Sequence, residues 1–367
     1  MRSLAHKLTA GVCVAALAYA IAAPASAAIP TTQKQYRLTR SGESGPFQLQ
    51  MVDAPVRAPG AGEVLVRVRA ASLNRHDVFV LNGQMTRLKS VVPLSDGAGE
   101  VVAVGEGARR FRVGDHVAAL FFQGWIGGRP PNVAGTVLGS DLDGMLTQYI
   151  TLNEQNLVKL PSNLSFEEGA TLPCAGVTAW NGLVTTGHMQ PGDYVLLEGT
   201  GGVSIFGLQF AVAAGAKPII TSSHDEKLER AKKLGAIGTV NYKTTPDWDK
   251  SVRQITGGEG VQEVLEVGGK DSLPHSLATL GRGGHIALIG GLGGFGGEIP
   301  ATSLMGAGIT ASGIYVGSRE NFEAMNAFIE KHHVKPLVDK VVDFKDAKQA
   351  FDLMEADDFM GKIVIKM

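Results

Sequence analysis

The sequence predicts an α/β protein made of two parts, a small mostly β part and a doubly wound parallel sheet. From Tyr36 to about Val158, short β-branched and apolar segments alternate with turns rich in Gly, Pro and Asp. From Gly192 onward, strands, glycine turns and helices follow one another repeatedly, which is typical of a parallel sheet covered by helices on both faces. The chain has 367 residues, 44% of them hydrophobic, which is enough for two cores.

The strands of the first part are expected in four segments, which are EVLVRVRAASLN (63–74), GEVVAVG (99–105), DHVAAL (115–120) and LTQYITL (146–152). The parallel sheet is expected from YVLLEG (194–199), PIITSS (218–223), TVNY (239–242), VLEVGG (264–269), HIALIGG (285–291) and GITASGIYVG (308–317). Helices are expected between them over 203–215, 225–236 and 247–257. The tail after residue 320 adds further helices and strands, and we expect it to return and complete the first part.

The start of the chain is typical of an export signal. Two basic residues precede an apolar run over residues 8–23, and Ala-Ser-Ala at residues 25–27 has the small-x-small pattern of a signal peptidase site. The run is shorter than the ~20 residues of a membrane span. We therefore predict a signal peptide over residues 1–27 and an exported, periplasmic protein, with a cytoplasmic protein as the alternative. Cys174 would be the one Cys of the mature chain, so no internal disulfide is expected.

The charges of the chain indicate what kind of partner it has. Lys and Arg total 34 and Asp and Glu total 35, giving a net charge of -1. There is no basic excess to hold nucleic acid or anionic lipid. We expect a small-molecule substrate or cofactor, no nucleic acid, and no membrane in the mature form.

The stretch LLEGTGGVSIFG places a glycine loop between a strand and a helix. Gly199 and Gly201 occupy the first two slots of G-x-G-x-x-G, and Ser204 occupies the third. The first glycine makes the tight turn and the second lets the backbone approach a pyrophosphate. The helix is expected to start near Val203, directly after Gly202, and its N-terminal amides would face the phosphates. This strand-turn-helix context predicts a Rossmann dinucleotide site.

The end of the second strand of that sheet indicates which dinucleotide is bound. An NAD site usually carries Asp or Glu there to hold the ribose 2′-hydroxyl, whereas this chain has Thr221, Ser222 and Ser223. The two serines can donate hydrogen bonds to a 2′-phosphate, and Lys227 one helical turn later can supply charge. The alternative for Lys227 is a solvated helix residue. We predict NADP(H) as the cofactor.

Three segments in this order and spacing resemble the medium-chain dehydrogenase/reductase superfamily. They are PLSDGAGEVVAVGEGARRFRVGDHV, LSFEEGATLPCAGVTAWNGL and GTGGVSIFGLQFAVAAGA. The resemblance implies a GroES-like, mostly β catalytic domain over 28–160 and 315–367, a Rossmann domain over 161–314, and an active site in the cleft between them. It also suggests a possible homodimer.

Alcohol dehydrogenases of this superfamily hold a catalytic zinc with Cys, His and Cys. At the matching positions this chain has Asn74, Ser95 and Cys174. One thiol beside an amide and a hydroxyl would not hold zinc, which needs three ligands chosen among Cys, His and carboxylate. The chain therefore resembles the zinc-independent, quinone oxidoreductase-like branch, and no metal is expected. Without a metal, alkoxide charge must be met by hydrogen-bond donors alone, so quinones, enones and related carbonyl compounds are the expected hydride acceptors.

Residue roles also follow from the resemblance. Asn74 lies where the first zinc ligand would be and can donate to a substrate oxygen. His76 lies where metal-dependent relatives keep a proton relay, and imidazole can carry a proton near neutral pH; its alternative is a satisfied polar residue near the phosphates. Asn74, His76 and Ser95 are the predicted catalytic residues. Asp77 is expected to accept bonds from loop amides.

Further cofactor contacts are implied outside the glycine loop. Thr178 is expected near the nicotinamide and Tyr242 near the adenosine 2′-phosphate. Gly290 and Gly291 would let the backbone approach the nicotinamide. Arg319 is expected either to reach a phosphate or to begin an exposed helix.

Two other functions remain open at this point. One is an NADP-dependent alcohol dehydrogenase that works without zinc, and the other is a dinucleotide-binding protein without turnover. The aromatic and glycine-rich segment 121–144 is expected to overhang the cleft, where Phe121, Phe122 and Trp125 either stack on a planar acceptor or form a local core.

Overall fold

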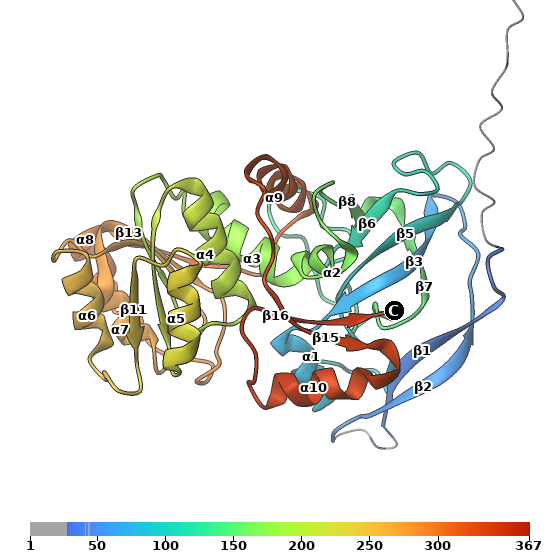
Figure 1. Cartoon of the computed structure of the whole chain (residues 1–367), viewed down its shortest axis with the longest axis horizontal. Helices are drawn as coiled ribbons and strands as arrows, with labels where there is room; N and C mark the ends of the chain where they lie inside the picture. The colour runs from blue at the N-terminus through green and yellow to red at the C-terminus, as the bar shows by residue number, and fades with distance from the viewer. Residues whose placement is uncertain (1–27, 41, 43–44) are drawn as a thin grey trace, which may run out of the picture. The chain divides into compact units, whose positions relative to one another are not determined.

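A computed structural model describes residues 28–40, 42 and 45–367 of the chain, and Figure 1 shows the arrangement of its elements. The predicted signal peptide, residues 1–27, lies outside the described residues. Residues Thr31–Met367 form one unit. No helix within the described ranges has the length and hydropathy that a bilayer crossing requires.

The strands of the second half form the predicted parallel sheet. They are β9 (Tyr194–Leu197), β10 (Lys217–Ser222), β11 (Gly238–Asn241), β12 (Val261–Glu266), β13 (Leu280–Leu288) and β14 (Thr310–Gly313). Their spatial order is β11-β10-β9-β12-β13-β14, and the paired neighbours run parallel. This is the order of a Rossmann fold, and its direction reverses between β9 and β12. The α/β fold class with a doubly wound sheet is confirmed.

Helices cover both faces of this sheet, on the left of Figure 1. They are α4 (Gly202–Ala214), α5 (Asp225–Lys233), α6 (Trp248–Ile255), α7 (Leu273–Thr279) and α8 (Ala301–Ala307). Leu196 on β9 belongs to an apolar cluster with Trp248 of α6, whereas the next residue, Leu197, belongs to a cluster with Phe206 of α4 and Leu228 of α5. Because neighbouring side chains of a strand point to opposite faces, the two clusters lie on opposite sides of the sheet.

The first part of the chain forms the mostly β lobe. Its larger sheet contains β3 (Glu63–Ser72), β5 (Asp96–Val104), β6 (His116–Ala119), β7 (Tyr149–Asn153), β8 (Leu157–Lys159), β15 (Val338–Asp343) and β16 (Lys362–Lys366). The strand order is β15-β16-β3-β5-β6-β8, and β7 also pairs with β3. A smaller sheet pairs β2 (Gln48–Pro55), β1 (Thr32–Thr39) and β4 (Ser90–Val91). The C-terminal strand β16 thus lies antiparallel beside β3, and the chain returns to this sheet.

Short helices complete this lobe and join it to the parallel sheet. The lobe holds α1 (Arg75–Leu81), the 3-10 turns η1 (Glu154–Asn156) and η4 (Phe344–Asp346), and α10 (Ala347–Glu355). The connecting segments are α2 (Phe166–Gly169), the π-helical turns η2 (Leu172–Gly176) and η3 (Asn181–Thr186), α3 (Val177–Trp180), and α9 (Arg319–His332). The predicted dividing points, after residues 160 and 314, fall between β8 and α2 and just after β14.

One apolar core extends across both lobes. It includes Val158 of β8 and Val364 of β16 from the mostly β lobe, Phe206 of α4 from the Rossmann lobe, and Leu172 and Phe322 from the connecting segments. All five side chains are buried. This continuous packing fixes the two walls of the cleft that lies between the sheets.

Candidate functional site

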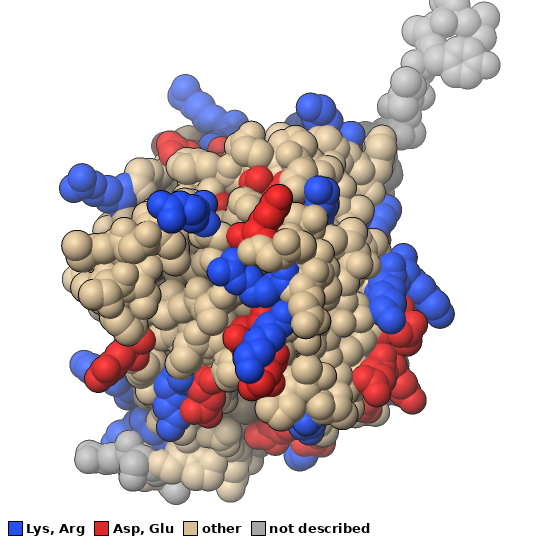
Figure 2. All heavy atoms as spheres, turned by 90° about the vertical axis from the view of Figure 1, so that its left-hand side faces the viewer, with Lys and Arg blue, Asp and Glu red and all other residues tan. Residues whose placement is uncertain are grey.

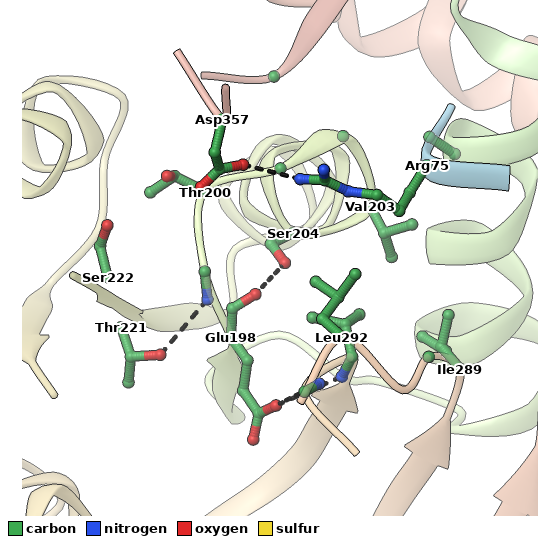
Figure 3. Close-up of a pocket in the computed structure, with 18 of the residues that line it drawn as sticks. Arg75, Glu198, Thr200, Val203, Ser204, Thr221, Ser222, Ile289, Leu292 and Asp357 are labelled. Carbon is green, nitrogen blue, oxygen red and sulfur yellow. Dashed lines mark hydrogen bonds and ion pairs between the residues drawn. The ribbon is translucent and has the colours of Figure 1, made fainter. Parts of the chain in front are cut away.

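A cavity of about 600 Å³ lies between the two lobes. One wall is formed by the turns that follow β9, β10, β12 and β13, and the other by the start of α1 and the segment between α10 and β16 (Figure 3). The Gly361 amide donates to the Thr200 carbonyl oxygen at 2.9 Å and joins the walls. The cavity therefore lies at the carboxyl ends of the parallel strands, around the point of strand-order reversal, where such sheets bind ligands.

The cavity brings most of the predicted site residues together. Those that line it are Asn74, His76, Gly199, Gly201, Gly202, Val203, Ser222, Ser223, Lys227, Tyr242 and Gly290. The predicted residues Ser95, Thr178, Gly291 and Arg319 are not among its lining residues.

The glycine loop has the geometry of a phosphate cradle. Gly199 turns the chain with φ of +70°, a conformation that favours glycine. Gly201 has an extended backbone, and no atom lies within 4 Å of the position where a Cβ would be. The protein without ligand therefore has room for a side chain at this position. The absence of one fits a ligand that approaches the backbone closely. Ser204, in the third slot, is buried and donates to the Glu198 carbonyl oxygen, so its hydroxyl is satisfied at the helix start.

A buried pair of carboxyls supports the turn after β12, and sequence reasoning missed it. Glu198 accepts from the amides of Val267 at 3.3 Å and Gly268 at 3.2 Å, and Glu266 accepts from Gly268 at 2.8 Å. The Ser276 hydroxyl lies within hydrogen-bonding range of both carboxyls. Burial and the neighbouring Glu266 hold the pKa of Glu198 well above its ordinary value, which favours the protonated acid. Two neighbouring side chains can thus share this site without repulsion between like charges.

The end of β10 presents hydroxyls to the cavity. Ser222 and Ser223 line the cavity, and the Ser223 hydroxyl lies 2.8 Å from Nδ1 of His224. The nearby carboxylate of Asp225 accepts from Nδ2 of Asn241 at 2.7 Å. Hydroxyl donors are therefore available where an adenosine ribose would lie. Lys227 lines the cavity as well, but its Nζ donates to a backbone oxygen of the opposite lobe, Asp357, at 2.9 Å.

A set of hydrogen bonds that one ion pair closes, which we call the polar ring, lies at the inner end of the cavity. It consists of Asn74, Ser95, Asp96, Cys174 and Lys362. Lys362 Nζ donates to Oδ1 of Asn74 at 2.5 Å, and Nδ2 of Asn74 donates to Ser95 Oγ at 3.3 Å. Ser95 Oγ donates to Oδ1 of Asp96 at 2.8 Å, and the Cys174 amide donates to Oδ2 of Asp96 at 3.1 Å. The ammonium of Lys362 closes the ring, 3.9 Å from Asp96.

The polar ring is buried, so its charges must compensate one another. Ser95 and Asp96 have no exposed surface, and Lys362 is 3% exposed. Burial raises the pKa of Asp96 above its ordinary value, and the Lys362 charge acts against this rise. Sequence reasoning placed Lys362 on a strand but gave it no role. The structure adds it to the site as a buried cation beside Asn74.

Asp77 is hydrogen-bonded to the backbone of Asn74, a member of the polar ring. Its carboxylate accepts from the backbone amide of Asn74 at 2.7 Å, which is the bond to a loop amide expected from the sequence. Burial raises the pKa of Asp77 to about 7, with a smaller contribution from the charge of Asp96. Asp77 thereby fixes the backbone of Asn74 at the start of α1.

His76 lines the cavity in an apolar setting. Its ring lies edge-on to Phe121, with 5.5 Å between the ring centroids, and its buried Nε2 has no hydrogen-bond partner among the described residues. Burial lowers the pKa of His76 to about 4, against an opposing effect of Asp141. The imidazole is therefore neutral at pH 7, so it can offer a substrate the hydrogen bond of its single N–H.

This lowered pKa predicts a pH dependence of stability. Between pH 6.5 and 4 the folded state binds fewer protons at His76 than the unfolded state does, so stability is lost as the pH falls through this range. We expect His76 to account for a loss of about 2 kcal/mol between pH 7 and pH 5. Urea denaturation at both pH values should show a smaller loss for His76→Gln than for the wild type. Equal losses in the two proteins would contradict the assignment.

The predicted residues outside the cavity have structural contacts that explain their positions. Ser95 is enclosed in the polar ring and positions Asn74 without reaching the cavity. Thr178 is buried on α3, next to the thiol of Cys174. Gly291 lies beside the ring of Phe295. Arg319 donates from Nη1 to Oε1 of Gln155 at 2.7 Å, so its guanidinium is held away from the cavity.

The aromatic residues of segment 121–144 form a local core. Phe121, Phe122 and Trp125 are at most 5% exposed and pack on one another. Phe122 also meets Tyr315, with 4.5 Å between the ring centroids. Of the two predictions for these aromatic residues, stacking on an acceptor or a local core, the structure supports the local core.

The residues at the zinc-ligand positions do not fit a zinc ion. Oδ1 of Asn74 accepts from an ammonium, and the hydroxyl of Ser95 is bonded on both sides within the ring. Cys174 is therefore the one side chain of the three that zinc could use, whereas zinc requires three such ligands. In the part of the chain that the structure describes, no three His, Cys, Asp or Glu side chains form a metal-binding group.

Comparison with known proteins decides the family. The description "Alcohol dehydrogenase GroES-like domain" matches residues 60–162, and "Zinc-binding dehydrogenase" matches residues 202–331. A zinc-type alcohol dehydrogenase-like protein of Schizosaccharomyces pombe is 46% identical over 315 residues, covering 83% of this chain and 91% of that protein. The chain belongs to the medium-chain dehydrogenase/reductase superfamily. The resemblance found in the sequence is thereby confirmed, and the relatives group this chain with alcohol dehydrogenase-like oxidoreductases.

Solved structures of the superfamily share this fold. A Sinorhizobium meliloti 1021 protein classed as an alcohol dehydrogenase superimposes with a TM-score of 0.87 at 36% identity, covering 93% of this chain and all of that one. An NAD-dependent alcohol dehydrogenase superimposes with a TM-score of 0.81 at 35% identity, covering 91% of this chain and 99% of that one. The chain therefore has the two-lobe arrangement of these structures.

Proposed function

We propose that this superfamily member is a zinc-independent, NADPH-dependent reductase that transfers hydride to a quinone, an enone or a related carbonyl compound. The proposal rests on one observation. A glycine loop on one wall of the cavity faces a polar ring on the other, and that ring holds the ammonium of Lys362 beside Asn74. The first feature suits a dinucleotide, and the second supplies positive charge and donors beside the cavity.

The cofactor is assigned to the Rossmann wall. The open space over Gly201 and the amides at the start of α4 suit the pyrophosphate. Ser222 and Ser223 would hold the 2′-phosphate of NADPH, and Gly290 lies where the nicotinamide end would reach the inner cavity. NADPH supplies a hydride when bound, and the protein supplies binding and orientation.

The substrate oxygen is assigned to Asn74. Because Lys362 can only donate, Oδ1 of Asn74 must face the ammonium, and Nδ2 is then the donor side of the amide. One of its two hydrogens goes to Ser95, and the second is free to meet a substrate oxygen. The nearby ammonium polarises this amide and stabilises developing negative charge. Acceptors that spread this charge over a conjugated system place the smallest demand on such a site.

A further hydrogen bond to the substrate oxygen is assigned to His76. The neutral imidazole carries one N–H and one free lone pair, and its buried Nε2 is not engaged by any described residue. It can donate to a substrate oxygen as charge develops there. The apolar contact with Phe121 keeps water away from this nitrogen.

The preference for NADPH over NADH can be tested by a substitution at the end of β10. Ser222→Asp would place a carboxylate at the end of β10, where it repels a 2′-phosphate and accepts from a 2′-hydroxyl. We expect the ratio of NADPH to NADH affinity to fall by about 10- to 100-fold. Fluorescence titration with both cofactors measures this ratio. Thr302→Asp, on exposed helix α8, is the control that should leave it unchanged.

Turnover is tested with the purified protein, NADPH and a panel of quinones, enones, aldehydes and ketones, with and without a zinc chelator. Oxidation of NADPH by a conjugated acceptor that persists with the chelator supports the proposal. Loss of activity on chelation contradicts zinc independence. Cofactor binding without turnover on any acceptor supports a dinucleotide-binding protein in its place.

A second candidate is an NADP-dependent alcohol dehydrogenase that works without zinc. It is favoured by the relatives and solved structures named as alcohol dehydrogenases. In the same assay, this function predicts reduction of NADP by alcohols and no dependence of rate on quinones.

A further inference from the structure

Asp357 links the two walls of the cavity at its opening. Its carboxylate accepts from Nη2 of Arg75, at the start of α1, at 2.8 Å. Its backbone oxygen accepts from Nζ of Lys227, on α5 of the Rossmann lobe, at 2.9 Å. All three residues line the cavity, and Figure 3 shows the guanidinium of Arg75 turned toward Asp357. One residue thus engages two cations of the cavity wall.

The position of Asp357 is close to the glycine loop. Four residues later in the chain, Gly361 pairs with Gly201 and donates to the carbonyl of Thr200 at 2.9 Å. Asp357 itself has a left-handed backbone with φ of 56°, which turns the chain between α10 and this contact. The segment that carries Asp357 therefore runs alongside the place where a pyrophosphate would bind.

The charges explain why this contact matters to a ligand. Arg75 is the guanidinium of the cavity wall, and a guanidinium binds phosphate oxygens in the same forked manner in which it binds a carboxylate. In the free protein Nη2 of Arg75 donates to Asp357, while Nη1 donates to the backbone oxygen of Met354 at 2.9 Å. A pyrophosphate in the glycine loop would meet both the cation and the carboxylate, and the carboxylate repels it.

We infer that Asp357 is an affinity-setting residue of the cofactor site, whose carboxylate holds Arg75 in the free protein and yields it to the pyrophosphate of a bound dinucleotide. The inference rests on the proposed function, because it requires that NADP(H) binds this cavity. Binding then exchanges an internal ion pair for an ion pair with phosphate. Removing the internal competitor strengthens binding of every dinucleotide that carries the pyrophosphate.

Asp357→Asn is the variant that tests this exchange. Asn is among the residues that tolerate a left-handed backbone, and the variant keeps the carbonyl that accepts from Lys227. The dissociation constants of the full chain for NADPH and for NADH are measured by fluorescence titration at low ionic strength. We expect both to fall by about two- to fivefold, because an exposed ion pair is replaced and a nearby like charge is removed.

Two further variants serve as controls. Asp358→Asn removes the neighbouring exposed carboxylate, which lies 4.0 Å from Lys340, and should leave both constants unchanged. In an Arg75→Gln background, Asp357→Asn should give a smaller gain, since only the direct repulsion between the carboxylate and the pyrophosphate is left to remove. A gain of the same size in that background would overturn the inference.

The remaining outcomes are also decisive. Unchanged or weaker binding by Asp357→Asn overturns the inference, and so does an equal gain from Asp358→Asn. A gain confined to NADPH would move the competition to the 2′-phosphate and contradict the assignment to the pyrophosphate. If the wild type binds neither dinucleotide, the proposed function fails together with the inference. If the wild type binds and Asp357→Asn brings no gain, only the inference fails.

Discussion

Replacing Gly201 with valine is expected to weaken NADPH binding by about 100-fold while leaving the fold intact. The backbone of Gly201 has φ of -76° and ψ of -175°, a conformation open to any residue. No atom lies within 4 Å of the site of a new Cβ, so the larger side chain meets no obstacle in the free protein. It would instead occupy the space through which a pyrophosphate approaches the backbone amides. Fluorescence titration measures the affinity, and thermal unfolding without cofactor measures the fold.

Gly306→Val is the matched control for this experiment. Gly306 lies on α8 and also has no atom within 4 Å of a new Cβ, but it does not line the cavity. Its replacement should change neither the affinity nor the unfolding temperature by much. An unchanged affinity in Gly201→Val would mean that the glycine loop is a structural turn, and the dinucleotide site would have to be sought elsewhere.

Replacing Lys362 with methionine is expected to lower the free energy of unfolding by about 3 kcal/mol at pH 7. Methionine matches the length and apolar stem of lysine but removes the ammonium that donates to Asn74 and to the Leu73 carbonyl. Asp96 is fully buried and would lose the cation that lies 3.9 Å away. A buried charge that has lost its partner destabilises the fold by more than the ion pair had stabilised it. Urea denaturation of the two proteins measures the difference.

A second variant separates the stranded charge from lost packing. Asp96→Asn added to Lys362→Met removes the charge and keeps an oxygen that can accept from Ser95. The double variant should therefore be more stable than Lys362→Met alone. If it is less stable, the two side chains do not compensate one another and the polar ring is not the unit described above.

The sequence predicted those parts of the molecule that are contiguous in it. The glycine loop, the helix after it and the hydroxyls of Ser222 and Ser223 lie within one strand-helix-strand unit, where local pattern determines geometry. The strand order of the Rossmann sheet was predictable as well, because a helix lies between each strand of that lobe and the next one. The glycine loop and the serine hydroxyls of this wall were therefore predictable from pattern and spacing.

Among the residues that sequence reasoning missed, Lys362 lies on the opposite wall, which distant segments assemble, whereas Glu198 and Glu266 come from the ends of two different strands of the Rossmann wall. Lys362 and Asn74 are 288 positions apart, so no local pattern connects them. Lys362 and Lys366 also alternate to the same side of β16 by spacing, yet the first is buried and the second is exposed. They differ because the stem of Lys362 packs beside Gly202 of the Rossmann lobe, whereas Lys366 reaches Glu167 with 58% of its side chain exposed. For Lys227 and Arg319 the residue type suggested phosphate contacts, whereas Asp357 and Gln155 accept from them in the structure.

The place of β16 in its sheet has a consequence for the order in which the protein matures on the ribosome. Ser72, at the end of β3, donates to the carbonyl of Ile363, a partner 291 positions further along the chain. At about 5–20 residues per second, β3 waits on the order of 15–60 seconds of synthesis for this neighbour. The parallel sheet, in contrast, is complete once Gly313 has emerged. A nascent chain therefore forms its nucleotide-binding wall first, and the polar ring is the last part of the site to be assembled.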